Sequence, residues 1–314
     1  MRSCVRFCLL AALLILAGQT FGQNLYVIAA RGNVKSKKTG KNLRSGDIIP
    51  TDDILTFRDQ TDLLSLMTEE GARFVVAYPL KRFKKKKAEY PLDLVRTQGA
   101  PATYPADPSF FSNAEAKAFF STRPFVFLGP ETRFRMNKKV FPMSRALFFY
   151  MNYDFKEDNI DKKIDYRGDT VILAKRALFK IDGKEVDGKY AENFQFYYYN
   201  QPKNQHTFLG KMQPYFPVDE RLKEETDVLV NRLTLRQATP ETIVKELAGF
   251  MQQHYGNVWG SDLTQWVKEQ YPALAGAADA AYAVAQTEAD AAAKVAAAEA
   301  LAAEKANKNK NKRK

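Results

Sequence analysis

The stretch from Leu25 to Tyr78 constrains the fold of this 314-residue chain more than any other part. Short runs of β-branched and aromatic residues alternate there with turn residues that include a glycine. The turn glycines are Gly32, Gly40, Gly46 and Gly71. A turn signal every eight to twelve residues, roughly, is typical of small antiparallel barrels and sandwiches. We therefore predict a small β module at residues 24–80, in which no residue pattern indicates catalytic chemistry.

The first 23 residues predict export. Arg2 and Arg6 precede an apolar run at 7–17, and the small residues Thr20 and Gly22 then form a cleavage site near Gln23. A membrane anchor is the alternative. The apolar run is much shorter than the roughly 20 residues that a spanning helix needs, so we predict a cleaved signal peptide and a mature protein that is soluble or peripherally attached.

The cysteine content restricts the chemistry of the mature chain. Both cysteines, Cys4 and Cys8, lie inside the predicted signal peptide. Their removal excludes a disulfide, a thiolate metal site and a cysteine nucleophile. The mature length suggests about two domains, and 45% apolar residues suffice to form their cores.

Positive charge is concentrated in two short runs. The formal net charge is +12, and the rest of the mature chain is close to neutral. The basic residues of the runs are Lys81, Arg82, Lys84, Lys85, Lys86 and Lys87, then Lys308, Lys310, Lys312, Arg313 and Lys314. Such runs are usually solvated segments without a partner. Contact with a polyanion or a partner is the functional alternative.

Composition divides the rest of the chain. Residues 81–124 combine the first basic run with a proline-rich linker, in which Asn113 to Phe120 is a short helical candidate. Residues 125–217 predict a second β-rich domain, a sandwich, in which 145–155 alternates poorly and is expected to be a strand buried on both faces. Its many aromatic residues are expected to be core, with a sugar-stacking platform as the alternative.

Helices are predicted from about residue 218. Residues 218–272 contain three amphipathic patterns, which can form a bundle or pack onto the preceding β domain. Thr239 is predicted as the N-cap of the second helix and Ser261 as that of the third. Alanine is the commonest residue of 273–306, which predicts one long helix, and 307–314 is predicted to be a basic disordered tail. The fold class is α+β, with a small antiparallel β barrel or sandwich, a second β-rich domain and a helical C-terminal part.

No catalytic or cofactor motif is evident, so we predict no catalytic, cofactor-binding or metal-binding residue. The two histidines, His206 and His254, are too few for a zinc site. The acidic stretch from Asp154 to Asp169 contains lysines and lacks the calcium-loop glycine, so a charged hairpin is expected and calcium is the alternative. A glycosidase could still hold two carboxylates that are distant in sequence.

Nucleic-acid binding is not expected. The segment from Asp219 to Pro272 could pass for a helix-turn-helix, but acidic residues outnumber basic ones in it. That charge has the wrong sign for contact with phosphates.

Several phrases resemble a group of exported, uncharacterised proteins of Bacteroidota-type bacteria. They include GNVKSKKTGKNLRSGDIIPTDDILTF, FPMSRALFFYMNYDF and HYGNVW. The first module is also similar to FecR-like β domains through a G-x-V…L-x-x-G-D pattern. The resemblance implies the periplasm or cell envelope of a Gram-negative bacterium and implies no activity.

The leading hypothesis is an exported, non-catalytic envelope protein that binds another envelope component, protein or glycan, with the two basic runs as contacts. Peripheral contact with an anionic membrane surface would fit the same runs. A cell-wall or glycan hydrolase with paired carboxylates is one alternative. A subunit of an envelope-associated assembly is another.

Overall fold

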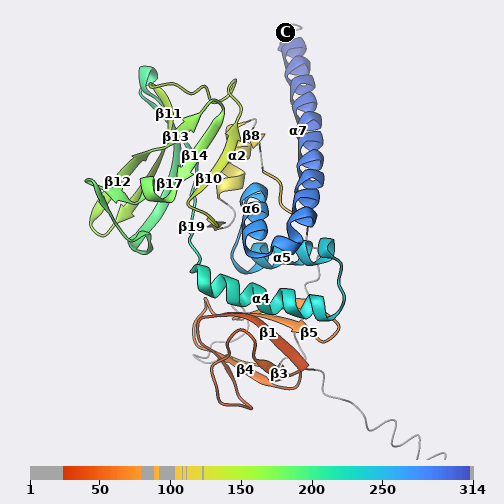
Figure 1. Ribbon diagram of the computed structural model, residues 1–314. Coiled ribbons are helices and arrows are strands. Elements are labelled where there is room, and N and C mark those ends of the chain that lie inside the picture. The colour runs from red at the N-terminus through yellow and green to blue at the C-terminus, as the bar shows by residue number, and fades with distance from the viewer. Residues whose placement is uncertain are drawn as a thin grey trace, which may run out of the picture. The chain divides into compact units, whose positions relative to one another are not determined.

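The computed structural model describes residues 24–78, 88–91, 103–107, 109–110, 112–121 and 124–311 (Figure 1). The chain forms two compact units. Unit 1 contains residues 1–100 and 224–232, and unit 2 contains 101–223 and 233–314. Helices and mostly antiparallel sheets are both present, which confirms a mixed fold. The predicted signal peptide lies outside the described residues.

Two sheets form the β part of unit 1. One sheet has the order β3-β1-β5-β6, with β1 at Asn24–Arg31, β3 at Ile48–Pro50, β5 at Leu63–Thr68 and β6 at Arg73–Ala77. The other has the order β2-β4-β7, with β2 at Val34–Ser36, β4 at Ile54–Phe57 and β7 at Ala88–Pro91. Both contribute to one apolar core that includes Val27, Leu55, Phe57 and Leu66. A barrel and a sandwich are the two predicted forms. The described strands leave open sheet edges and therefore do not close a barrel.

The four predicted turn glycines of unit 1 all have positive φ, a conformation that favours glycine in turns. Gly32 also approaches a buried carboxylate, because a Cβ at this position would lie 1.8 Å from Asp62 Oδ1. Asp62 accepts backbone hydrogen bonds from Asn33, Arg58 and Asp59. These bonds explain why a carboxylate is buried here, since it satisfies donors that the turns leave open.

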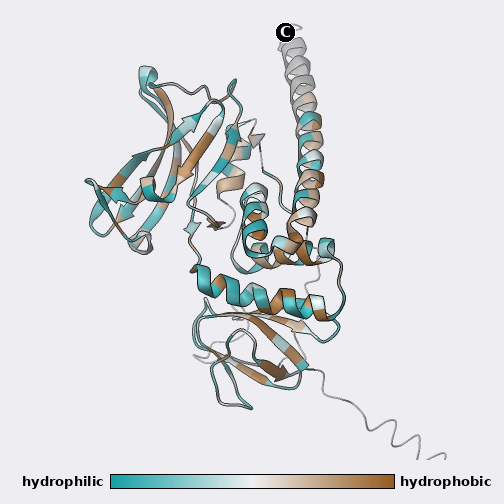
Figure 2. Cartoon of the chain, viewed as in Figure 1, coloured by the Kyte–Doolittle hydropathy of each residue, from teal (hydrophilic) through white to brown (hydrophobic). Residues whose placement is uncertain are grey.

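Part of a distant helix completes unit 1. Helix α4 spans Asp219–Leu235, is largely teal with brown patches in Figure 2, and contributes 224–232 to this unit. The Arg232 guanidinium carbon lies 3.5 Å from the centroid of the Tyr26 ring. A Cβ on Gly46 would lie 3.9 Å from Val228. The unit therefore includes residues that the sequence assigns to the helical segment.

Unit 2 contains two four-stranded sheets that share one core. The first has the order β13-β14-β10-β8: β8 is Ser109–Phe110, β10 Glu131–Met136, β13 Asp165–Arg167 and β14 Thr170–Ala174. The second has the order β12-β11-β17-β18: β11 is Leu147–Phe155, β12 Asp158–Lys163, β17 Ala191–Asn200 and β18 Gln205–Gly210. Phe134 of the first sheet and Phe149 and Phe196 of the second are buried in the shared core. Aromatic rings such as these bury a large apolar surface.

Shorter elements border these sheets. Helix α2 spans Asn113–Phe120 as predicted, and Ser112 accepts a hydrogen bond from the Glu115 amide as its N-cap. The remaining strands form two small pairs: β15 (Lys180–Ile181) with β16 (Lys184–Glu185), and β9 (Phe125–Val126) with β19 (Pro214–Tyr215). Helix α3 spans Lys175–Leu178, and short 3-10 turns lie at Gly188–Tyr190 (η2), Gln201–Lys203 (η3) and Pro272–Leu274 (η4).

The helical part of unit 2 reaches its β core through a residue between two helices. Helix α5 spans Pro240–His254, α6 Gly260–Gln270 and α7 Ala275–Asn311. Thr239 caps α5 as predicted, by accepting from the Thr242 amide. Trp259 stacks on Phe134 of the β core, with ring centroids 5.0 Å apart and an angle of 4° between the rings. The segment 218–272 therefore follows neither alternative as a whole: α5 and α6 both contact α7, Trp259 between them reaches the β core, and part of α4 belongs to unit 1.

Two predicted helix boundaries are wrong. Ser261 is not the N-cap of α6, since this helix begins at Gly260 and the Asp107 carboxylate accepts the hydrogen bond of the Ser261 amide. A side chain distant in sequence therefore replaces the local cap. The long helix α7 continues to Asn311, into the stretch predicted as a disordered tail. Helix formation is cooperative, so a helix that begins in the alanine-rich sequence continues into the lysine-asparagine sequence, where lysine also favours helix.

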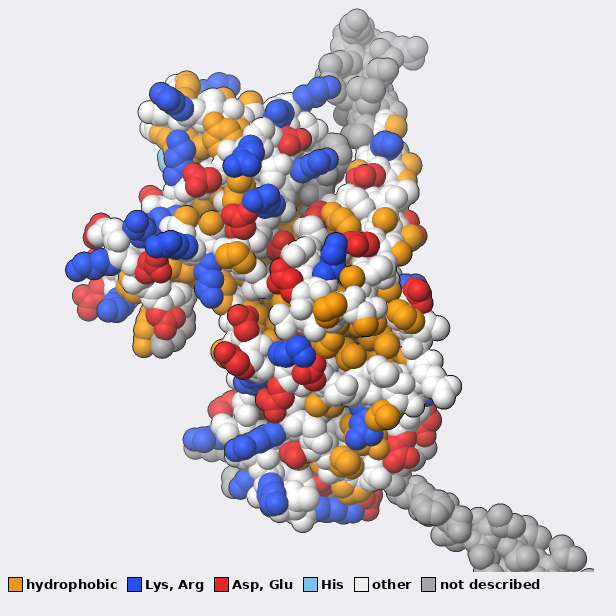
Figure 3. Space-filling view, in the orientation of Figure 1, with side chains coloured by type: hydrophobic (Ala, Val, Ile, Leu, Met, Phe, Trp, Pro, Cys, Tyr) orange, Lys and Arg blue, Asp and Glu red, His pale blue; other side chains and the backbone are white. Residues whose placement is uncertain are grey.

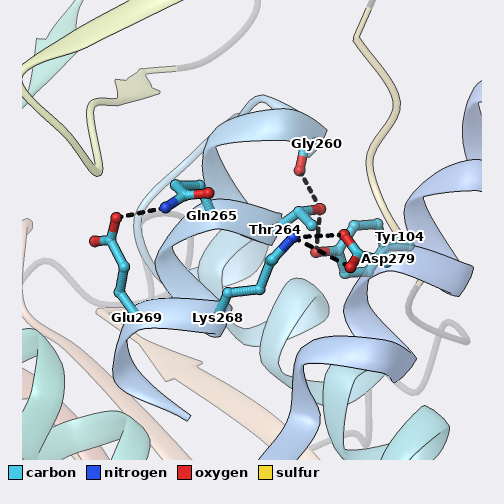
Figure 4. A network of polar contacts seen from close by, with 7 residues as sticks. All are labelled: Tyr104, Gly260, Thr264, Gln265, Lys268, Glu269 and Asp279. Atoms are coloured by element: carbon cyan, nitrogen blue, oxygen red, sulfur yellow. Dashed lines mark hydrogen bonds and ion pairs between the residues drawn. The ribbon is translucent and has the colours of Figure 1, made fainter. Parts of the chain in front are cut away.

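Part of the predicted proline-rich linker is packed against helices. Tyr104 is buried, and its hydroxyl is joined to Thr264 by a 2.9 Å hydrogen bond (Figure 4). Thr264 in turn donates to the Gly260 carbonyl. A Cβ on Gly260 would lie 2.2 Å from the Pro105 carbonyl oxygen, so this close approach requires glycine. Residues 103–107 therefore form a strap across α6, which corrects the expectation of a linker.

Candidate functional site

Strand β11 separates its side chains onto two faces. From Phe149 to Phe155, buried and partly exposed residues alternate without interruption. The prediction of a strand buried on both faces is wrong, because aromatic residues occupy positions on both sides and hide the alternation in the sequence. We call the side turned away from the core the outer face of the sheet β12-β11-β17-β18.

One half of the outer face is aromatic. Cross-strand register places Phe148 opposite Tyr199, Tyr150 opposite Tyr197, and Tyr197 opposite Phe208. We call the following residues the aromatic half: Phe148, Tyr150, Tyr197, Tyr199, His206 and Phe208. All are partly or fully exposed. The aromatic residues predicted as core are therefore divided between the core and this exposed face.

The rings of the aromatic half hold one another in place. Tyr150 and Tyr197 stack with centroids 5.0 Å apart at 8°, and Tyr199 stacks on His206 at 4.3 Å. The Tyr150 hydroxyl and His206 Nδ1 form a 3.0 Å hydrogen bond. Burial raises the pKa of Tyr150 to about 12, and the negative charge of Asp161 adds to this effect. The ring cluster is therefore a fixed surface rather than a set of loose side chains.

The other half of the outer face is polar. We call the following residues the polar half: Asn152, Asp154, Asn159, Asp161, Asn193 and Gln195. Register places Asn152 between Asp161 of β12 and Gln195 of β17. The Asn152 amide nitrogen donates to Asn159 at 2.5 Å and to Asp161 at 2.8 Å.

Asp154 lies at the end of this polar network. It accepts hydrogen bonds from Asn159 at 2.9 Å and from Asn193 at 2.7 Å. The bonds from Asn193 and Asn159 lower the pKa of Asp154, so the carboxylate stays ionised. The network joins β12, β11 and β17 by side chains that remain accessible to solvent.

Basic and aromatic groups border the two halves. Lys163 lies opposite Tyr150 on β12, and its ammonium is 4.0 Å from the centroid of the Phe148 ring. It also donates to the Arg145 carbonyl at 3.2 Å. In the space-filling view, hydrophobic side chains lie among charged ones over the region of β11 and β12 (Figure 3). Apolar and polar contacts are thus available side by side.

The acidic stretch forms two hairpins, in agreement with the prediction of a charged hairpin. Asp154 and Asp161 flank the β11–β12 turn, where Lys156 has a φ of 56°. Asp165 and Asp169 belong to the next hairpin, β13–β14. Within the described ranges, no three His, Cys, Asp or Glu side chains come together in a way that could hold a metal ion.

A second carboxylate cluster lies between β10, α6 and α7. Asp107 lines a cavity of about 360 Å³ together with Arg133, Arg135 and Tyr282. Burial raises the pKa of nearby Asp262 to about 7, and the negative charges of Asp107 and Glu131 act in the same direction. A hydrolase would need an acid of raised pKa inside its cavity, whereas Asp262 is not among the residues that line this one.

Both carboxylates of this second cluster already take part in contacts between elements. Asp107 accepts hydrogen bonds from the Ser261 amide and from the Tyr282 hydroxyl, at 3.1 and 2.9 Å. Asp262 accepts from the Thr132 hydroxyl at 2.6 Å. The cluster therefore joins the strap, β10, α6 and α7, and this structural role accounts for its position.

The remaining sequence candidates lie elsewhere. His206 belongs to the aromatic half, and His254 is buried at the end of α5, where its ring stacks on Phe250. The first basic run, at 81–87, lies outside the described residues, as do Lys312, Arg313 and Lys314. The positions of Lys308 and Lys310 fall within helix α7.

The sequence reasoning missed the polar half as a unit. Asn152 and Asp154 occur at every second position after Phe148 and Tyr150, and Gln195, Tyr197 and Tyr199 repeat the same spacing. That period of two was the available signal. The register of the two strands places amides beside amides and rings beside rings, and this register could not be predicted from the sequence.

Comparison with known proteins identifies no relative of this chain. The chain matches no protein-family model, and no curated protein or solved structure is significantly similar to it. Among the described residues, no helix is both long and apolar enough to cross a bilayer.

Proposed function

We propose that this chain is an exported envelope protein that works by binding a glycan chain on the outer face of the sheet β12-β11-β17-β18. A single observation carries the proposal: one open face holds a cluster of rings beside a cluster of amides and carboxylates. A sugar ring has the same two kinds of surface, since its C–H groups are apolar and its hydroxyls donate and accept hydrogen bonds.

The aromatic half supplies the apolar part of the contact. Tyrosine combines a large apolar ring with a polar hydroxyl, and this favours it at surfaces that bind. Tyr197 and Tyr199 lie at the centre, on the strand between β11 and β18. Stacking with Tyr150 and His206 fixes their rings before any ligand arrives. A ligand therefore does not need to order them, which reduces the entropy lost on binding.

The polar half supplies the hydrogen bonds. Carboxamides and carboxylates such as Asn152, Asp154 and Gln195 can pair with adjacent hydroxyl groups. The bonds between Asn152, Asn159 and Asp161 hold these groups in position. The same preorganisation that favours the aromatic half therefore applies to both halves.

Export and the two basic runs complete the proposal. The predicted signal peptide would deliver the chain to the envelope, where polysaccharides are abundant. The runs at 81–87 and 308–314 would add electrostatic contact with an acidic component. Such contact weakens as salt rises, whereas stacking on the rings of the outer face should not, because the rings carry no net charge.

The test is sedimentation of the mature chain with polysaccharide purified from the cell envelope. Replacing both Tyr197 and Tyr199 by Ala should raise the Kd at least about tenfold, because each aromatic contact contributes on the order of 1 kcal/mol. Tyr190→Ala is the control, since this tyrosine is 54% exposed and lies in η2, outside the four strands.

Circular dichroism of each variant would show whether the fold is retained. Equal binding by the folded double variant and by the wild type would refute the proposal. Loss of binding in Tyr190→Ala to the same degree would also count against it, because the effect would not belong to the face.

A further inference from the structure

The polar half carries negative charge, which the proposed function does not use. Asp154 and Asp161 both lie on this half, and the partners that hold them are the neutral amides of Asn152, Asn159 and Asn193. Amide donors stabilise a carboxylate without cancelling its charge. The polar half is therefore a negatively charged surface.

One cation of the outer face belongs to the other half. Lys163 is opposite Tyr150 in register, and its ammonium contacts the Phe148 ring and the Arg145 carbonyl. The effect of Asp161 on Tyr150 points in the same direction, since its negative charge contributes to the raised pKa of that hydroxyl. Negative potential thus extends from the polar half to the edge of the aromatic half.

We infer that the outer face selects glycans of uncharged or amino sugars over glycans of anionic sugars, with Asp154 and Asp161 as the specificity-determining residues. The inference rests on the proposed function, because it assumes that a glycan occupies this face. Hydroxyl, acetamido and ammonium groups can all donate hydrogen bonds to these carboxylates. The carboxylate or sulfate of an acidic sugar would instead meet like charge, which disfavours it.

The dimensions of the face fit a chain rather than a single sugar. Four strands at their usual spacing extend over about 14 Å. The aromatic half and the polar half share this width, and Asn152 is the next outward residue after Tyr150 on β11. A chain with one sugar over Tyr197 would place a following sugar beside Asn152 and Asp161. Ring contact would then supply affinity, and the carboxylates would supply selectivity.

The experiment compares four hexasaccharides by titration calorimetry with the mature chain. They are hexamers of glucose, N-acetylglucosamine, glucosamine and galacturonic acid, measured at mildly acidic pH so that amino groups are protonated. The galacturonic acid hexamer should bind at least about fivefold more weakly than the glucose hexamer, as expected for exposed charges. Replacing Asp154 and Asp161 by Asn should reduce that difference and weaken binding of the glucosamine hexamer.

Asp182→Asn is the matched control. Asp182 is an exposed carboxylate in the β15–β16 turn, off the outer face, and its positive φ of 48° is one that Asn also adopts. It removes one carboxylate charge from the molecule without changing the face, so its hexamer ranking should equal that of the wild type.

The outcomes separate the inference from the proposed function. If all hexamers bind equally and binding is lost in Tyr197→Ala/Tyr199→Ala, the glycan function stands and the charge selectivity is wrong. Preferred binding of the galacturonic acid hexamer through the face would also overturn the selectivity. If no hexamer or envelope polysaccharide depends on the two tyrosines, or the face retains only a protein, the function itself fails and the inference with it.

Discussion

Phe149 and Tyr150 are neighbours in sequence but lie on opposite faces of one sheet. On the inner face, Phe149 stacks on Phe196 with centroids 5.5 Å apart at 13°. On the outer face, Tyr150 stacks on Tyr197 at 5.0 Å and 8°. The ring geometry is nearly the same on both faces. The surroundings differ, since the inner rings are enclosed by both sheets of unit 2 and the outer rings border amides, carboxylates and solvent.

This difference shows that residue type alone does not separate core from surface in such a sheet. An inner ring stabilises the fold because its whole surface is removed from water. An outer ring keeps part of its surface exposed, and that part is available to a ligand. The two faces should therefore respond differently to the same substitution.

The largest expected difference is between Phe196→Ala and Tyr197→Ala. Phe196 is fully buried, so its loss should lower the free energy of unfolding by about 3–5 kcal/mol, as for other buried phenylalanines. Tyr197 is partly exposed, so its loss should lower it by less than about 1.5 kcal/mol. Urea denaturation followed by circular dichroism measures both. Equal losses would remove the distinction between the faces.

The next effect concerns pH and a residue away from both faces. The pKa of Asp262 is raised from 3.8 to about 7, so the folded protein keeps a proton there that the unfolded chain releases. Stability should fall as pH rises through that interval and then level off, because the folded state binds more protons. Asp262→Asn should remove this dependence and leave glycan binding unchanged. A stability curve with the same slope in the variant would contradict the assignment.

A smaller effect should separate two tyrosine hydroxyls. Tyr153 is buried and donates to the Leu178 carbonyl at 2.5 Å, whereas the Tyr199 hydroxyl donates to exposed Asn204 at 3.1 Å. Tyr153→Phe leaves a buried carbonyl without its partner and should cost about 1 kcal/mol. Tyr199→Phe should cost almost nothing, since water replaces the bond. Thermal unfolding of both variants provides the comparison, and a larger loss in Tyr199→Phe would reverse it.

The smallest effect concerns the outer face at alkaline pH. The pKa of Tyr150 is raised from 10.0 to about 12. Its raised value favours the protonated hydroxyl in the folded state, so its contribution to stability is complete below pH 10 and is lost as pH rises toward 12. Tyr150→Phe should make unfolding less sensitive to pH in that interval. An unchanged alkaline profile would show that the hydroxyl is as solvated as in the unfolded chain.

Local signals in the sequence predicted much of the fold. The glycine turns of unit 1, helix α2 and the Thr239 cap depend on residues that are close together in sequence, and all agree with the structure. The alanine-rich helix was also predicted, because its propensity is intrinsic.

Predictions that depended on distant contacts were less successful. Asp107 caps α6 from more than a hundred residues away, and no local pattern indicates it. Residues 103–107 resemble a linker until Tyr104 is placed against Thr264. The sequence favours core for the aromatic residues of 125–217 and leaves a sugar platform as the alternative, and the division between core and surface required the pairing of β11 with β17.

The central claim is that the exposed aromatic half contacts a glycan. Covalent footprinting of the protein, with and without saturating envelope polysaccharide, tests it most directly because it reports individual side chains. The account predicts that labelling of Tyr150, Tyr197 and Tyr199 falls on addition of glycan, while labelling of Tyr190 stays constant. Unchanged labelling of those three tyrosines, with protection of other residues instead, would contradict it.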